Sequence, residues 1–241
     1  MLLQLRDIAR FYGSRLVFKG VSLGVRRQSV TLLAGANGAG KSTLLKIMAG
    51  LIRPSAGDIL MDDGKEAVSV GFLGHMTFLY PELSAMENLR FWAKLHRLAL
   101  PLSSFEDMLE RVDLSAFAGE KAKSFSRGMA QRLNLARVFL PRPALLLLDE
   151  PGTGLDTRST AILHREIASA KADGAGIVWI THSLEDDIAR ADTVALLADR
   201  RLAFSGSVED YKRRRGALPT SAIEARPDDV NTRMAGGGEP C

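Results

Sequence analysis

The stretch "GANGAGKST" at 35–43 constrains the fold most, because of the segments on either side of it. It follows the continuous apolar run "VTLLAGA" at 30–36 and opens the segment "KSTLLKIMAGL" at 41–51, which has helical periodicity. A buried strand, a glycine-rich turn and a helix in this order are the context in which G-x-x-x-x-G-K-[ST] is credible as a phosphate-binding loop. The sequence therefore predicts an α/β protein that binds a nucleotide at this turn.

The chemistry of phosphate binding explains these residue types. Glycines let successive backbone N–H groups approach a phosphate, and the start of the helix adds positive potential. Lys41 would bring a charge to the β- and γ-phosphates, and the Ser42 hydroxyl can bind Mg²⁺. We expect ATP and Mg²⁺ as ligands, with nucleotide contacts from Gly35, Ala36, Asn37, Gly38, Ala39, Gly40, Lys41, Ser42 and Thr43. The alternative, an incidental glycine-rich turn, is disfavoured by the flanking strand and helix.

Two further apolar strands end in candidate catalytic groups. "PALLLLDE" at 143–150 delivers Asp149 and Glu150 to the carboxyl edge of the sheet, where ligands of open α/β sheets bind. Asp149 would help to hold Mg²⁺, and Glu150 would polarise the attacking water as general base. His182 ends "GIVWITH" at 176–182 and would donate to the γ-phosphate. Taken alone, the carboxylate pair is equally consistent with an ordinary strand end, but the phosphate loop favours a functional role for it, and the strand position of His182 in the same sheet favours one for that residue.

Alternation of strand and helix patterns predicts a mostly parallel sheet covered by helices. Helical periodicity between Ser84 and Leu140 predicts a helical subdomain at about 83–140. We expect strands at 2–5, within 16–33, and at 57–60, 67–73, 143–150, 176–182, 193–198 and 201–206, and helices at 41–51, 84–98, 103–112, 126–140, 157–172 and 183–190. A hairpin is expected around Asp199 and Arg200. The domain is predicted over 1–215, with 216–241 as a disordered tail because its composition shifts to Gly, Pro, Ala and charge.

Composition narrows the possible partners only slightly. The formal net charge of +4 mildly favours a polyanion or an anionic membrane surface as a partner, but it is small for a protein that binds duplex nucleic acid. The single cysteine, Cys241, cannot build a disulfide framework or a zinc site, which favours a reducing compartment. We expect no signal peptide, and no apolar run approaches the roughly 20 residues that span a bilayer. A role at a membrane would therefore require a partner.

Five motifs in a fixed order carry a family resemblance: the loop at 35–43, "FSRGMAQR" at 125–132, "LLLLDEP" at 145–151, "GLD" at 154–156 and "THS" at 181–183. This order resembles the nucleotide-binding subunit of an ABC transporter over nearly all of residues 1–210. The resemblance implies ATPase activity. It also implies a P-loop NTPase (RecA-like) fold whose mostly parallel sheet carries an antiparallel β subdomain and a helical subdomain.

The resemblance also carries site residues onto this chain. The family's "LSGGQ" signature closes over the ATP of a second protomer, and here Ser126 and Gly128 keep it, whereas Arg127 and Met129 depart from it. Ser126 is also expected to cap the following helix. Three further positions match family sites: Tyr12 for stacking on adenine, Asp156 for coupling the two sites of the dimer, and His75, in place of a Gln, for contact with Mg²⁺ and the attacking water.

Within "SFSRGMAQRLNLAR" at 124–137, Arg132 and Arg137 are expected to be helix-surface or packing residues. Whether Arg127 faces the phosphate or solvent is left open by the sequence. The basic cluster "YKRRRG" at 211–216 is expected to be a solvated helix end, with contact to anionic lipid headgroups as the alternative.

For partners, the resemblance implies a head-to-tail dimer of ATPase subunits and integral membrane subunits docked near 75–100. The protein would be peripheral, at the cytoplasmic face of the inner (cell) membrane. The "GH" at 74–75 followed by "ELSAMENLRF" is similar to haem-exporter ATPases of cytochrome c maturation, whereas "DEPGTGLD" and "FSRGMAQR" also resemble drug, lipid or polysaccharide exporters. No nucleic acid is expected. A nucleic-acid- or ribosome-associated ATPase of this kind usually has fused domains or a coiled-coil insert, whereas this sequence has a single phosphate loop and no sustained heptads. A kinase would not explain "FSRGMAQR".

Overall fold

The computed structural model describes residues 1–62, 68–74, 76–181 and 183–218. Within them, a six-stranded sheet has the order β5-β6-β7-β3-β8-β9. Neighbours from β5 to β8 run parallel, and β9 pairs antiparallel with β8. The strands are β3 (Ser29–Ala34), β5 (Val70–Leu73), β6 (Leu145–Asp149), β7 (Gly176–Ile180), β8 (Thr193–Ala198) and β9 (Arg201–Ser207). The predicted mostly parallel sheet is therefore confirmed.

A smaller antiparallel sheet is built from strands near the N-terminus, with β3 of the large sheet lying between β2 and β4 in the chain. Among the described residues it has three strands in the order β2-β1-β4, with β1 at Leu3–Tyr12, β2 at Arg15–Val25 and β4 at Ala56–Met61. The predicted strand over 2–5 was too short. Asp7 has φ of 50° beside a register shift in β1, so the alternation of buried and exposed residues breaks there although pairing continues to Tyr12. The segment 16–33 likewise divides into β2 and β3 at a turn where Gln28 has φ of 53°.

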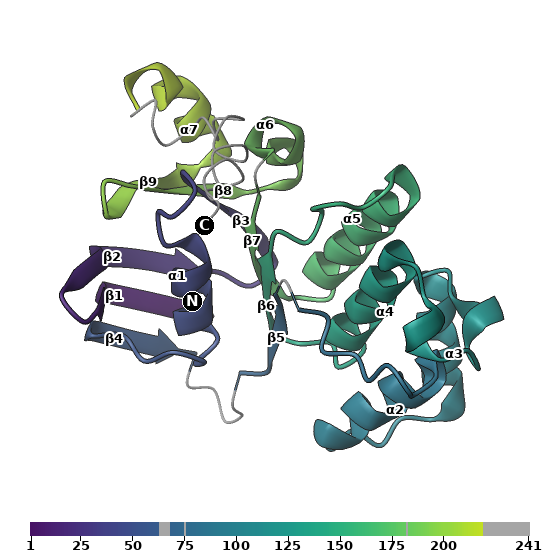
Figure 1. Cartoon of the computed structure of the whole chain (residues 1–241). Helices are drawn as coiled ribbons and strands as arrows, with labels where there is room; N and C mark the ends of the chain where they lie inside the picture. The colour runs from purple at the N-terminus through teal and green to yellow at the C-terminus, as the bar shows by residue number, and fades with distance from the viewer. Residues whose placement is uncertain (63–67, 75, 182, 219–241) are drawn as a thin grey trace, which may run out of the picture.

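Helix α1 (Lys41–Met48) lies between the two sheets (Figure 1). Its apolar residues pack into one buried cluster with residues from β1 and β2 and from one face of the large sheet. The fully buried side chains of α1 in this cluster are Leu44, Leu45, Ile47 and Met48. Helix α1 is thus anchored by its apolar side chains directly after the glycine loop that follows β3.

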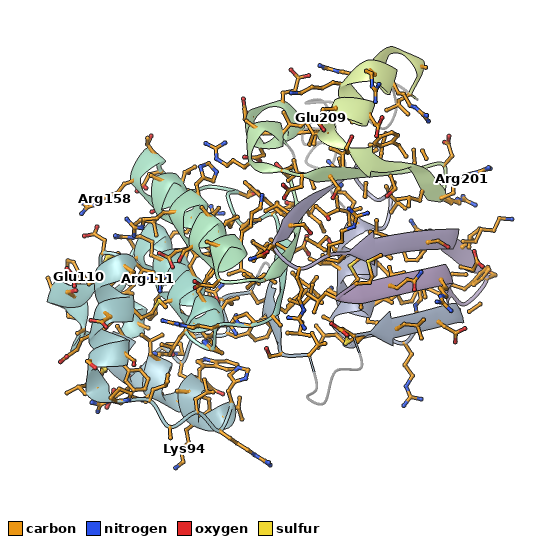
Figure 2. The ribbon with its side chains drawn as sticks, turned by 180° about the vertical axis from the view of Figure 1, so that it is seen from behind. Lys94, Glu110, Arg111, Arg158, Arg201 and Glu209 are labelled. Carbon is orange, nitrogen blue, oxygen red and sulfur yellow. The ribbon has the colours of Figure 1, made fainter. Side chains whose placement is uncertain are left out.

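The opposite face of the large sheet carries α5 (Thr157–Ala172) and the predicted helical subdomain, formed by α2 (Ala85–Leu95), α3 (Leu102–Arg111) and α4 (Arg127–Phe139) (Figure 1). These helices share a second buried apolar cluster with strand residues such as Leu146, Leu148 and Trp179. Figure 2 shows charged side chains of these outer layers; Lys94, Glu110 and Arg158 are exposed.

The remaining elements complete the edges of the fold. They are α6 (Leu184–Asp187), α7 (Val208–Arg214) and the 3₁₀ helices η1 (Ser115–Phe117), η2 (Ala122–Ser124), η3 (Ile188–Arg190) and η4 (Arg215–Ala217). The predicted hairpin is confirmed: Asp199 and Arg200 both have positive φ, as a two-residue turn between twisted strands requires. Basic residues occupy the last turn of α7, as expected for a helix C-terminus. Most of the predicted tail, 219–241, lies outside the described residues.

Candidate nucleotide site

The phosphate-binding loop joins β3 to α1 with Gly40 as the N-cap of the helix. Gly40 has φ of 102°, and a Cβ there would lie 2.7 Å from Val17 Cγ1 and 2.8 Å from Phe18 Cδ1. Two features therefore disfavour any residue other than glycine at position 40: the positive φ, and the packing of β2 side chains against the loop. The result is a glycine turn that leads directly into the free N–H groups of a helix start.

Lys41 is buried at the base of this loop, with 5 % of its surface exposed. Its Nζ donates to the carbonyl oxygens of Gly35 at 2.7 Å and Ala36 at 3.1 Å. Burial lowers the pKa of Lys41, and the charges of Glu150 and Asp149 oppose that shift. The ammonium group is thus held by main-chain dipoles within the loop, close to two carboxylates.

Ser42 and Asp149 meet although they lie 107 residues apart in the chain. The Ser42 hydroxyl donates to Asp149 Oδ1 at 3.0 Å, and Asp149 is 2 % exposed at the end of β6. A hydroxyl and a carboxylate are the oxygen ligands that Mg²⁺ prefers, so the donor set fits that ion. Within the described residues, no group of three or more His, Cys, Asp or Glu side chains could hold a metal ion.

A cavity of about 640 Å³ opens in front of the loop, within the size range of small-molecule sites. Tyr12 stands at its wall, 47 % exposed, with the Arg10 guanidinium 4.4 Å from the centre of its ring. The cavity is lined by Tyr12, Arg15, Leu16, Val17, Asn37, Gly38, Ala39, Gly40, Lys41, Ser42, Thr43, Glu150 and Arg200. The predicted aromatic residue, the loop and the predicted base therefore face one space.

Glu150 occupies a strained position directly after β6. Its φ is 53°, uncommon for a residue with a side chain, and its backbone N–H donates to the Ile180 oxygen of β7 at 3.1 Å. The same residue lines two further cavities, one beside Arg127 and Asp149 and one beside His164 and Asp187. Glu150 therefore lies where three cavities meet.

The signature segment lies apart from the chain's own phosphate loop. Ser126 caps α4 as predicted, its hydroxyl accepting from Met129 N at 3.3 Å, yet neither Ser126 nor Gly128 lines the described part of the Lys41 cavity. Arg127 has a contact within its own chain. Its guanidinium lies against Gly154, where a Cβ would be 2.9 Å from Nη2.

Asp156 likewise lies outside the described lining of the Lys41 cavity. It caps α5, accepting from Ser159 N at 2.7 Å, and this backbone hydrogen bond lowers the pKa of Asp156. An ideal Cβ on Gly128 would be 3.8 Å from Asp156 Oδ2, so the two predicted dimer-facing segments are neighbours within one chain. His75 and His182 lie outside the described residues, and their predicted roles stay predictions.

Arg137 is a buried cation whose full setting the sequence did not reveal. It is 7 % exposed, donates to Asn134 Oδ1 at 2.9 Å, and lies 4.7 Å from the ring of Trp92 and 5.7 Å from that of Phe78. Burial lowers the pKa of Arg137 to about 10. The expected packing role is confirmed, but the aromatic partners come from other segments and left no signal in the local sequence.

Comparison with known proteins places the chain. The family model described as "ABC transporter" matches residues 18–153, more than half of the sequence. This chain belongs to the ABC transporter family. It is therefore an ATP-binding, ATP-hydrolysing transporter subunit. The predicted fold class is confirmed by the ATP-binding subunit of an ABC transporter, which superposes with a TM-score of 0.80 at 30 % identity over 92 % of this chain and 96 % of that one.

Relatives within the ABC transporter family have diverse names. The linearmycin resistance ATP-binding protein LnrL of Bacillus subtilis is 30 % identical over 89 % of this chain and 72 % of its own length. The cytochrome c biogenesis ATP-binding export protein CcmA of Paramagnetospirillum magneticum is 36 % identical over 74 % of this chain and 86 % of its own. No helix in the described ranges is long and apolar enough to cross a membrane.

Proposed function

We propose that this subunit binds ATP at the loop 35–43 and hydrolyses it to drive export through separate membrane subunits. The observation that carries this function is the convergence of Lys41, the Ser42–Asp149 pair and Glu150 at the carboxyl ends of β3 and β6. Tyr12 would stack on the adenine, and the loop N–H groups with Lys41 would hold the phosphates. Ser42 and Asp149 would hold Mg²⁺, which supplies charge neutralisation on the phosphates when it is bound.

Glu150 is the proposed general base. Its backbone is fixed on β7 through Ile180, so its side chain has a defined approach to the Lys41 cavity that it lines. A carboxylate held in this way can accept a proton from a water molecule. The positive φ of Glu150 is consistent with strain retained at a functional position.

Two copies would form the working unit, each placing its signature on the other's nucleotide. Ser126 and the start of α4 provide a hydroxyl and free N–H groups suited to phosphate, but they do not reach the described lining of the chain's own Lys41 cavity. A head-to-tail dimer would join these halves and bring the Gly154–Asp156 loops together. ATP would then be enclosed between the protomers.

The membrane subunits would dock on an exposed aromatic face of the segment 76–95, and the subunit would be peripheral, on the cytoplasmic side of the membrane. Phe78, Tyr80 and Phe91 are 47 %, 44 % and 37 % exposed, and the rings of Tyr80 and Phe91 pack edge to face at 4.4 Å. Leu95 adds a side chain that is 60 % exposed. Clustered apolar surface of this kind marks an interaction site.

For the exported class we favour haem export for cytochrome c biogenesis. Two relatives bearing the cytochrome c biogenesis name, from Paramagnetospirillum magneticum and Gluconobacter oxydans, are 36 % and 38 % identical to this chain. The second candidate is a drug, lipid or polysaccharide exporter. It is favoured by the resistance proteins LnrL and DrrA3, which match over 89 % and 85 % of the chain at 30 % and 31 % identity.

Co-purification tests the transporter assignment. The tagged chain should recover an integral membrane protein from detergent-solubilised membranes. Phe91→Glu should abolish recovery without changing ATP affinity, whereas Leu51→Glu, at a residue 62 % exposed after α1, should not. Recovery of no membrane protein would contradict the assignment. Deletion of the gene for this chain separates the two substrate classes. Loss of c-type cytochromes would support haem export, whereas sensitivity to a compound that the transporter exports would support the second candidate.

A further inference from the structure

A second cavity, of about 380 Å³, lies on the other side of Glu150 and contains a buried acid outside the predicted nucleotide contacts. Its walls come from Glu150 and the turn after it, from α5, from the end of β7 and from α6. Asp187 is 8 % exposed there. Buried carboxylates are costly unless they are hydrogen-bonded, so the contacts of Asp187 indicate what it holds in place.

Asp187 holds Thr181, the residue that follows β7, and through it Ser183. Its Oδ2 accepts from Thr181 Oγ1 at 2.5 Å, and Thr181 Oγ1 in turn accepts from the backbone N–H of Ser183 at 3.0 Å. The backbone N–H of Asp187 donates to the Ser183 oxygen at 3.1 Å. These hydrogen bonds tie the residues on both sides of position 182 to one carboxylate.

The second oxygen of Asp187 faces α5. Oδ1 lies 3.7 Å from His164 Nε2, and the His164 ring packs against Trp179 with centroids 5.7 Å apart. Burial raises the pKa of Asp187, opposed by Thr181, His164 and Arg190, and the charge of Asp186 adds to the rise. Burial lowers the pKa of His164, assisted by Arg190. The carboxylate is thus fixed from α5 and from the turn at once.

This network is continuous with the proposed base. Glu150 N donates to the oxygen of Ile180, the residue immediately before Thr181. At the end of β7, Ile180 is therefore held by a hydrogen bond from Glu150, and the next residue, Thr181, is held by its hydrogen bond to Asp187. We propose that Asp187, acting through Thr181, is a positioning residue for ATP hydrolysis and fixes the end of β7 relative to Glu150.

This inference rests on the hydrolytic role proposed for Glu150, so its first test is independent of hydrolysis. Amide hydrogen exchange at Ser183 in the ATP-free chain reports directly on the hydrogen bond from its N–H to Thr181 Oγ1. Asp187→Ala and Thr181→Val should each speed that exchange several-fold, and Thr181→Ser, which keeps the hydroxyl, should restore protection. Glu185→Gln, which removes an exposed charge from the same helix, is the matched control. Unchanged exchange in Asp187→Ala would overturn the inference.

Turnover is the second readout. Asp187→Ala and Thr181→Val should each lower kcat roughly 10- to 100-fold, as misplacement of a reacting group does, with KM for ATP within about 2-fold. The double variant should be no slower than either single one, because both remove the same link. Multiplicative losses, or a loss confined to KM, would show a general structural role and refute the inference. If the wild-type chain does not hydrolyse ATP while the variants change exchange at Ser183 as expected, the proposed function is contradicted and not the contact of Asp187.

Discussion

Replacing Lys41 by Met should weaken ATP binding while leaving the nucleotide-free fold about as stable as before. Lys41 is 5 % exposed, and burial lowers its pKa, so the charged form is disfavoured by desolvation in the ATP-free state. Its two hydrogen bonds to Gly35 and Ala36 contribute about 0.5–1.5 kcal/mol each, and these half-buried carbonyls can be hydrated once Nζ is gone. Met keeps the length and apolar contacts of the side chain, so relief of desolvation offsets these losses. The free energy of unfolding should change by no more than about 1 kcal/mol.

The ATP complex has no such compensation. Charge-assisted hydrogen bonds to phosphate are worth about 1.5–3 kcal/mol, so Kd should rise roughly 10- to 150-fold. Titration calorimetry measures Kd, and chemical unfolding with and without MgATP measures the two stabilities. Stabilisation by ATP should shrink by the same free energy, because it follows RT ln(1 + [ATP]/Kd).

Lys46→Met is the matched control, since Lys46 is an exposed residue on the same helix and should change neither quantity. Two results would refute the reasoning for Lys41. An unchanged Kd would mean that the ammonium does not contact the nucleotide. A fall in the stability of the ATP-free chain larger than the loss of binding free energy would mean that Lys41 serves the fold.

Three further perturbations have defined outcomes. Glu150→Gln should slow hydrolysis by about 10²- to 10⁴-fold with ATP affinity retained, and should accumulate an ATP-bound dimer in size-exclusion chromatography; absence of that dimer would count against Glu150 as the base. Arg137→Ala should destabilise the fold by about 3 kcal/mol through lost cation–π contact, hydrogen bonding and packing, whereas Arg90→Ala at an exposed position of α2 should change it by less than about 0.5 kcal/mol in thermal unfolding. The lowered folded-state pKa of His164 means that the unfolded chain takes up its proton first as pH falls below 6.5, so stability should drop there. His164→Gln should remove that part of the drop in a pH series of urea unfolding, and an unchanged slope would show that His164 does not titrate differently in the two states.

Much of the nucleotide site was predictable because its determinants are local. A buried strand, a glycine turn and a helix start are contiguous, so the loop and Lys41 follow from the neighbouring residues 30–51. Capping is equally local: Ser126 was predicted as the cap of α4, and its hydroxyl accepts from a backbone N–H only three residues further on. Strand lengths were less predictable, since β1 continues past a bulge that breaks its alternation.

The sequence by itself therefore determined which chemical groups this chain brings to a nucleotide, because periodicity, glycine content and capping act over a few residues. The tertiary structure alone decided which of those groups contact one another directly. Ser42 reaches Asp149 across 107 residues, Arg127 turns onto Gly154 of its own chain, and Asp187 gathers Thr181 and His164 into one buried network. Such contacts depend on how the sheet stacks its strands and which helix covers them, and no spacing in the sequence encodes a distance across that sheet.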